Sequence, residues 1–387
     1  MEFARAVALV AGVLVVLVTV WSVFTSLVVP RAASSRLQTA VGRLIGGGTR
    51  FVVPHLDNYE TKDRLLSFVG PATMVLLFGL WLGLLVLGFS LILWWSTGFD
   101  FATALGISGS SVFTLGIASS SEAGARTLEI LAAAIGLLVI ALEIAYLPAL
   151  YSAFATRETE VTLLATRAGT PAWGPEILAR HHWLDTMNEL PPLYADWERW
   201  AAAVSESHAN YPALMWFRSP APLRSWLVGL VAMMDSAALF HASSAGLTPR
   251  EARTCLQMGT NCLRSMAAAL KIPYDPDPLP TTGIRLSRAE FDEGFRRLQS
   301  VGFPLERDAD ETWRHFQGWR VNYEGIVDAL SELVLPPPAP WFLPRPRLGP
   351  TQWPLILNRT PDEPEGAQAF GVNKTFKTPS ERESNNS

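Results

Sequence analysis

Residues 101–118 of the chain read FATALGISGSSVFTLGIA, a pattern that fits neither a membrane span nor an ordinary loop. The stretch is moderately apolar, rich in Gly, Ser and Thr, and too short to cross about 30 Å of hydrocarbon. Non-helical backbone at membrane depth must be buried in protein or line a water-filled cavity. We therefore expect a re-entrant element over 99–118, with a short helix from Phe101 to Phe113 and an extended segment after it.

Three apolar runs are long enough to span a bilayer, namely Ala6–Val29, Pro71–Trp95 and Leu128–Phe154. At 1.5 Å per helical residue, each covers the roughly 30 Å of hydrocarbon. The first run is longer than the apolar core of a signal peptide and lacks a basic segment before it, which favours a retained span. The sequence thus predicts transmembrane helices over 1–30, 71–95 and 127–155.

The distribution of basic residues predicts the orientation of these helices. The connection 31–70 carries six Lys and Arg residues, whereas 96–126 carries only Arg126, at its very end. Cytoplasmic loops are enriched in Lys and Arg. We therefore expect a multi-pass plasma-membrane protein whose N-terminus and re-entrant segment lie outside and whose chain after residue 158 is cytoplasmic.

Within the cytoplasmic linker 31–70, Arg36, Arg43 and Arg50 recur every seven residues. A basic amphipathic helix on the inner leaflet binds anionic headgroups, so membrane lipids are expected partners. The alternative is plain positive-inside charge on an irregular linker. Glycines at 46–48 favour that alternative, because each costs about 1 kcal/mol in a helix.

The order of an outer span, a short re-entrant helix, a glycine-bearing strand and an inner span is typical of tetrameric cation pores. Backbone carbonyls of an extended segment replace the water shell of the ion there, and small residues let four chains approach one axis. The expected selectivity filter is Thr114, Leu115, Gly116, Ile117 and Ala118. The alternative is that this segment is merely a loop between spans.

The sequence resembles bacterial potassium-channel-like proteins of the two-transmembrane, single-pore-loop type. The resemblance covers residues 71–158, where SVFTLG at 111–116 stands for the start of the pore signature. It continues in YLPALYSAF at 146–154, LLATRAG at 163–169, ESHANYPAL at 206–214 and FRS at 217–219. It implies a homotetrameric channel of the bacterial inner membrane that conducts monovalent cations, K⁺ first, by passive diffusion.

The filter departs from the family's Thr-x-Gly-(Tyr or Phe)-Gly-Asp signature at three successive positions, which hold Ile117, Ala118 and Ser119. An Ala forced into a left-handed conformation costs roughly 1–2 kcal/mol, and four subunits would each incur it. Two functions stay open on this evidence. One is a cation channel with a degenerate filter, and the other is a non-conducting sensor or scaffold that acts through its cytosolic domain.

The third span carries residues that suit a pore. Glu143 is an ionisable group in an apolar helix, and such groups normally face protein or water. A ring of four carboxylates would attract cations to a pore cavity, although a protonated, hydrogen-bonded packing role is the alternative. Gly136 and Pro148 are candidate gate hinges, but Gly and Pro are also common in membrane helices.

The remainder reads as a helical cytosolic domain over 159–335 and a Pro-rich tail over 336–387 that we expect to be extended or disordered. Residues 223–242 form either a buried core helix or a fourth span, and Arg224, Asp235 and His241 favour the core helix. The net charge of −4 excludes a nucleic-acid binder. We expect no catalytic residue, metal site, cofactor or small-molecule substrate, because no defensible nucleophile and base, ligand spacing or phosphate loop is present. The predicted fold is an all-α membrane protein with three spans, a re-entrant pore helix and a mainly helical cytosolic domain.

Overall fold

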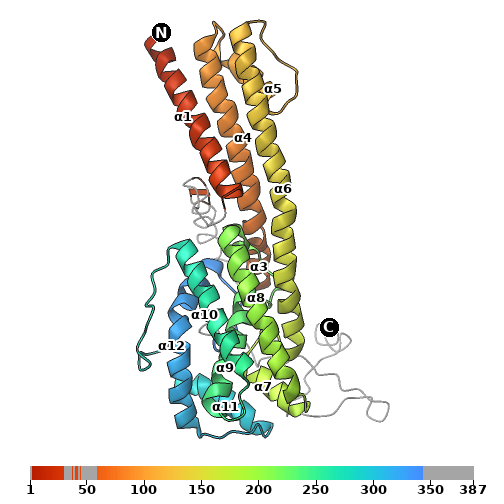
Figure 1. The fold of residues 1–387 in the computed structure, drawn as a ribbon, viewed down its shortest axis with the longest axis vertical. Coiled ribbons are helices and arrows are strands. Elements are labelled where there is room, and N and C mark those ends of the chain that lie inside the picture. Colours follow the sequence, from red (N-terminus) through yellow and green to blue (C-terminus); the bar gives the residue numbers. More distant parts are fainter. Residues whose placement is uncertain (1, 30–36, 38–39, 42–43, 45–58, 343–387) are drawn as a thin grey trace, which may run out of the picture. The chain divides into compact units, whose positions relative to one another are not determined.

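The computed structural model describes residues 2–29, 37, 40–41, 44 and 59–342, and this part of the chain is all-helical. The apolar helices come first along the chain (Figure 1). They are α1 (Glu2–Leu27), α4 (Val69–Ser96), α5 (Phe101–Val112) and α6 (Ala123–Ala168), and the short polar helix α3 (Tyr59–Ser67) precedes α4. We name residues 174–334 the helical bundle. It contains α7 (Gly174–Trp183), η2 (Met187–Glu189), α8 (Leu190–Asn210), η3 (Pro212–Trp216), α9 (Trp226–Ser243), α10 (Arg250–Leu270), α11 (Arg288–Ser300) and α12 (Ala309–Val334).

Four helices of the described residues are long and apolar enough to cross a membrane, and they differ in burial. For α1, α4 and α6, 33%, 39% and 28% of the most apolar 18-residue stretch is buried within the protein. Large apolar helices that leave most of their surface uncovered fit a membrane-embedded protein. The fourth, α9, is 94% buried, so protein covers its apolar surface. Its burial agrees with a core helix.

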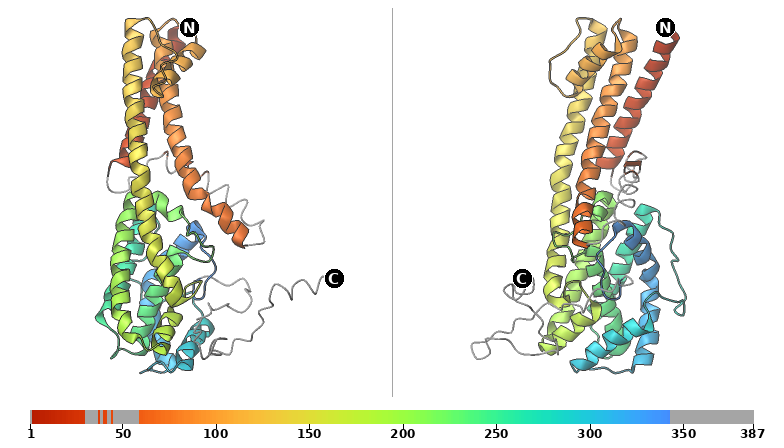
Figure 2. Two further views of the ribbon diagram at one scale, coloured as in Figure 1. Left: turned by 90° about the vertical axis from the view of Figure 1, so that its right-hand side faces the viewer. Right: turned by 180° about the vertical axis from the view of Figure 1, so that it is seen from behind.

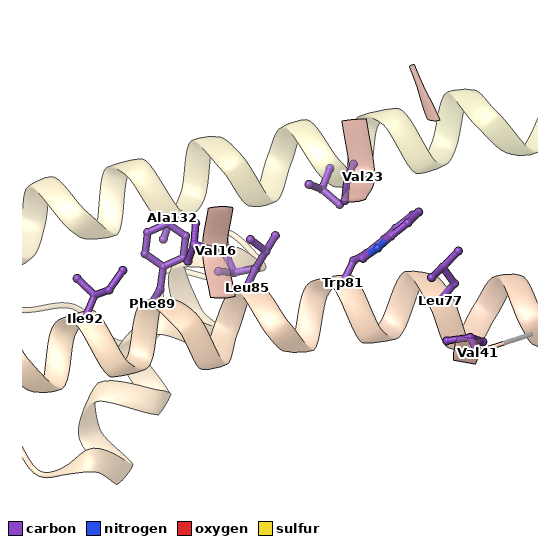
Figure 3. Close-up of a cluster of buried hydrophobic side chains, with 11 residues drawn as sticks. Val16, Val23, Val41, Leu77, Trp81, Leu85, Phe89, Ile92 and Ala132 are labelled. Atoms are coloured by element: carbon purple, nitrogen blue, oxygen red, sulfur yellow. The ribbon is translucent and has the colours of Figure 1, made fainter. Parts of the chain in front are cut away.

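Contacts between α1 and α4 form the apolar core of the membrane-embedded part. A row of large side chains along α4, including Trp81, Leu85 and Phe89, is buried against Val16 and Val23 of α1 (Figure 3). The indole nitrogen of Trp81 donates to the Ser22 hydroxyl at 3.0 Å. This bond satisfies an indole N–H that the core would otherwise bury unpaired.

The helix α6 is 46 residues long and includes Pro148. Figure 2 shows it as one continuous helix. The sequence predicted its apolar part, but the helix continues 13 residues past residue 155. Beyond that point Arg157, Val161 and Leu164 are buried, because α6 packs there on α8 and α9. The change from a lipid-type to an amphipathic pattern marks the end of the apolar run and not the end of the helix.

In the helical bundle, α9 packs against α7, α8, α10 and α12. One buried carboxylate on α9 orients α12, because Asp235 accepts from Arg320 and from the Tyr323 hydroxyl, both at 2.7 Å. Arg320 also pairs with Glu324 at 3.0 Å. Such a network contributes little net stability, but removing one partner leaves a buried charge uncompensated.

The start of the Pro-rich tail, which the sequence predicts to be extended or disordered, has no helix or strand over 336–339 and is packed against the helical bundle. Trp341 is 5% exposed and stacks on Phe291 with ring centroids 5.9 Å apart. Its indole nitrogen donates to the Glu290 carbonyl at 2.8 Å, and Arg320 donates to its carbonyl at 2.5 Å. Composition could not reveal that one aromatic residue anchors the prolines around it. The rest of the predicted tail, 343–387, lies outside the described residues.

Candidate functional site

The short helix α5 begins where the sequence predicts and is well capped. Asp100 accepts backbone hydrogen bonds from Ala102 at 3.1 Å and Thr103 at 3.3 Å. The Thr103 hydroxyl donates to the same carboxylate, which lowers the pKa of Asp100 and keeps it charged. A carboxylate at a helix N-terminus is stabilising. The cap therefore fixes where α5 starts.

Contacts on both sides hold α5 between α4 and α6. The Ser108 hydroxyl donates to the Val86 carbonyl of α4 at 2.7 Å. On the other side Val112 lies so close to Gly136 of α6 that a Cβ at position 136 would overlap the Val112 carbonyl. Gly136 is thus required for helix packing, which gives this residue a role besides the predicted hinge.

The chain leaves α5 through a C-terminal cap that uses the first two residues of the predicted filter. The N–H of Thr114 donates to the Ser111 carbonyl at 2.9 Å, and the N–H of Leu115 donates to the Ser110 carbonyl at 2.8 Å. This is the Schellman pattern, in which the residue after the cap has a left-handed backbone. Thr114 occupies that position with φ of 55°. Glycine is usual there, and a β-branched residue costs roughly 1–2 kcal/mol.

Two further anchors fix the end of the loop. The N–H of Ala118 donates to the Ser110 hydroxyl at 3.0 Å. Ser120, which is 3% exposed, donates its N–H to Glu129 at 2.8 Å and accepts from Arg126 Nε at 3.1 Å. Because Arg126 and Glu129 belong to the first turns of α6, the loop is attached to α5 at one point and to α6 at the next.

Between the cap and these anchors the side chains point outward. Leu115 and Ile117 are 60% and 81% exposed, and Gly116 adopts a left-handed backbone with φ of 69°. An open cavity of about 370 Å³ lies beside the loop. Its polar lining consists of Ser110, Ser111, Thr114, Ser119, Arg126 and Glu129. The cavity offers hydroxyl groups and backbone carbonyls together with one charge of each sign.

Glu143 lies away from this cavity, on the buried face of α6. It is 8% exposed and shares that face with Gly136 and Val139. Its Oε1 has no hydrogen-bond partner among the described residues. A neighbouring face of α6, with Ile130, Leu137 and Ile144, is exposed. In a single chain Glu143 therefore faces its own protein, and its role at a pore cavity stays a prediction.

The other predicted site residues are placed as follows. Pro148 is exposed and does not interrupt α6. Arg36, Arg43 and Arg50, the predicted lipid contacts, lie outside the described residues. Among residues that the structure does describe, no group of three or more His, Cys, Asp or Glu side chains is placed to hold a metal ion.

Sequence reasoning missed the anchoring roles of Ser110, Ser120, Arg126 and Glu129. A signal was present, since a polar pair spaced three apart at a helix start can reach back to the loop before it. Comparison of the chain with family models, curated proteins and solved structures found no match. The function must therefore be argued from the site itself.

Proposed function

We propose that this chain is one subunit of a homotetrameric channel for monovalent cations, with K⁺ as the first candidate. The observation that carries the proposal is the arrangement of residues 100–120. A capped 12-residue helix sits between two long apolar helices, and a loop that is anchored at both ends presents Gly116 and its neighbours outward. Carbonyls held in place on such a loop can replace water around a cation.

The surfaces of α1 and α6 support an assembly of several copies. The exposed face of α1 carries mainly large residues, including Val7, Leu14 and Trp21. The exposed face of α6 alternates large with small ones, in the order Ile130, Ala134, Leu137, Ala141 and Ile144. In a membrane the hydrophobic effect does not drive association between helices, and small residues favour it by letting helix backbones approach closely. We assign the face of α6 to contact with other copies and that of α1 to lipid.

The proposed orientation follows from the basic residues of 31–70. The N-terminus and the loop 113–122 lie outside the plasma membrane, and the helical bundle lies in the cytoplasm. A Cys introduced at the exposed residue Ser119 tests this orientation. A membrane-impermeant thiol reagent added to intact cells labels it if the loop is outside, and labelling only after lysis contradicts the orientation.

Flux measurement tests conduction. Purified protein in liposomes is expected to pass K⁺, and Gly116→Ala is expected to reduce the flux, because Ala at φ of 69° strains all four loops. Gly79→Ala is the matched control, since a Cβ at position 79 of α4 meets nothing within 4 Å. Glu143→Gln tests the cavity charge. Flux equal to that of empty vesicles contradicts the proposal.

A non-conducting sensor or scaffold is the second candidate, and the loop supplies a specific observation in its favour. The apolar side chain of Ile117 is exposed, and the backbone N–H groups of Thr114 and Leu115 serve as a helix cap. The combined substitution of Ile117→Tyr, Ala118→Gly and Ser119→Asp separates the two candidates. A silent protein that becomes K⁺-selective favours the scaffold, whereas a conducting parent whose selectivity merely sharpens favours the channel.

A further inference from the structure

One fully buried cation lies outside the candidate site, on the part of α6 that packs against the helical bundle. Arg157 is 1% exposed. Its guanidinium donates to the carbonyls of Leu214 and Phe217, each at 2.7 Å, and pairs with Glu158 at 2.8 Å. It also lies over the Phe154 and Trp226 rings, 5.2 and 5.7 Å from their centroids, and its Nη1 is 3.1 Å from Nε2 of His208 on α8.

The hydrogen bonds of His208 determine where its proton lies. Nδ1 is 3.0 Å from the Val204 carbonyl, which only accepts, so Nδ1 carries the hydrogen. Nε2 must then accept from Arg157, which only donates. The imidazole is therefore neutral while Arg157 is docked. A proton on Nε2 would remove the acceptor and place a second positive charge beside the guanidinium.

The surroundings of His208 contain little that could compensate such a charge. Arg157 is the charged group that faces it from α6, and the Glu158 carboxylate already pairs with Arg157. From α9 the Trp226 ring packs on the imidazole with centroids 5.3 Å apart, and on α8 the Ser207 hydroxyl lies 3.3 Å from Nδ1. Burial and the Arg157 charge hold the pKa of His208 well below its usual range.

The two carbonyls that Arg157 binds belong to a segment that connects the bundle to the membrane-embedded helices. We name residues 211–217 the docking segment. Tyr211 packs on Tyr146 of α6 with ring centroids 5.2 Å apart. Leu214 and Phe217 are buried with Met74 of α4 and Leu150 of α6. Release of Arg157 would remove the hydrogen bonds that hold this segment to α6 and leave only the apolar packing on α4 and α6.

We propose that His208 makes the attachment of the docking segment to α4 and α6 sensitive to protons. The docked state requires an unprotonated Nε2, whereas the undocked state exposes His208 and binds a proton as an ordinary histidine does. Acid therefore shifts the equilibrium toward the undocked state. This device holds whether or not the assembly conducts ions, and in a channel it would pass a pH signal to α4 and α6.

The size of the effect follows from linkage. An exposed histidine titrates near pH 6.5. If the docked state binds no proton at Nε2, lowering the pH from 7.5 to 5.5 favours undocking by about tenfold. Glutamine at position 208 offers an oxygen acceptor to Arg157 without titrating, so His208→Gln is expected to abolish this dependence while preserving docking.

Hydrogen–deuterium exchange of the purified full chain in detergent tests the proposal without any flux measurement. After correction for the intrinsic pH dependence of exchange, peptides covering 211–217 are expected to lose about tenfold in protection between pH 7.5 and 5.5. Peptides from α10, which contains no histidine, are expected to lose less protection, because they report only the change in global stability. Unchanged protection of 211–217 in the unsubstituted protein overturns the proposal, and so does equal loss in α10, which would mean global unfolding.

Two variants test whether the pH effect arises at His208 and not at another histidine. His208→Gln is expected to remove the loss of protection, and His315→Gln, at a half-exposed histidine of α12, is expected to retain it. Persistence of the full pH effect in a folded His208→Gln protein contradicts the assignment to His208. If that variant does not fold, the exchange of the unsubstituted chain still decides between docking and global unfolding.

Discussion

The substitution Gly136→Ala separates a packing role of this glycine from a hinge role. A Cβ at position 136 overlaps the Val112 carbonyl oxygen and lies 2.9 Å from both the carbonyl carbon and Cα of Val112. Non-bonded carbon atoms prefer about 3.5–4.0 Å, so α5 or α6 must shift by on the order of 1 Å. Overpacking of this kind costs typically 1–3 kcal/mol.

The matched variant Gly79→Ala supplies the reference. A Cβ there is free of contacts, so that variant keeps only the gain in helix propensity of about 1 kcal/mol. The same gain applies at position 136. The free energy of unfolding is therefore expected to be about 1–3 kcal/mol lower for Gly136→Ala than for Gly79→Ala.

Denaturant titration in detergent micelles, followed by tryptophan fluorescence, measures this difference. A shift of α5 would also displace the loop that it carries, so we expect the stability loss to be accompanied by altered flux. Equal stability of the two Ala variants would refute the packing argument. Unchanged stability together with slowed opening would instead indicate the hinge.

Three further predictions concern other parts of the chain. Replacing Glu129 by Ala is expected to release the Ser120 N–H and raise amide exchange in residues 118–122, whereas Glu129→Gln, which retains an acceptor oxygen, is expected to keep these amides protected. Equal exchange in both variants contradicts the role of Glu129 as the anchor of Ser120. Arg218 pairs with Asp63 at 2.5 Å and donates to the Val334 and Leu335 carbonyls at 3.0 Å, so Arg218→Met is expected to lower the free energy of unfolding by about 3–5 kcal/mol. The double variant Arg218→Met with Asp63→Leu is expected to lose less than the sum of the two single variants, and additive losses in denaturant titration would count against a coupled pair. Burial lowers the pKa of His181 and of His208, so below about pH 6.5 the unfolded chain binds more protons than the folded chain. The free energy of unfolding is therefore expected to be constant above neutrality and to fall on acidification, by up to about 1.4 kcal/mol per pH unit per histidine. A constant free energy of unfolding from pH 7 to 5 contradicts this prediction.

The sequence predicted the apolar helices well, because hydropathy over 20 residues integrates many small contributions. Helix α4 spans Val69–Ser96, where Pro71–Trp95 was expected, and α5 spans Phe101–Val112, where Phe101–Phe113 was expected. The Asp100 cap and the left-handed Gly116 are local features that short patterns carry. Pore formation, orientation and assembly of four subunits stay predictions.

Contacts between distant residues could not be predicted. Arg157 reads in the sequence as one of several positive-inside charges, yet it binds carbonyls 57 and 60 residues further along the chain. Glu143 reads as a pore-lining charge, yet in one chain it faces the protein. Burial of a polar side chain depends on which helices pack together, and periodicity within one helix does not specify its neighbours.

Disulfide cross-linking at the loop tests most directly whether copies of residues 114–118 meet at a shared axis. Ile117 is 81% exposed, so Ile117→Cys places a thiol on the surface of the loop. Phe3 on α1 is 83% exposed, and Phe3→Cys is the matched control. The native Cys255 and Cys262 are buried, and burial raises the pKa of both thiols, to about 12 for Cys262, so they stay unreactive. Under mild oxidation in native membranes we predict covalent dimers for Ile117→Cys and none for Phe3→Cys. A monomeric Ile117→Cys protein, or equal cross-linking at both positions, would contradict the shared axis.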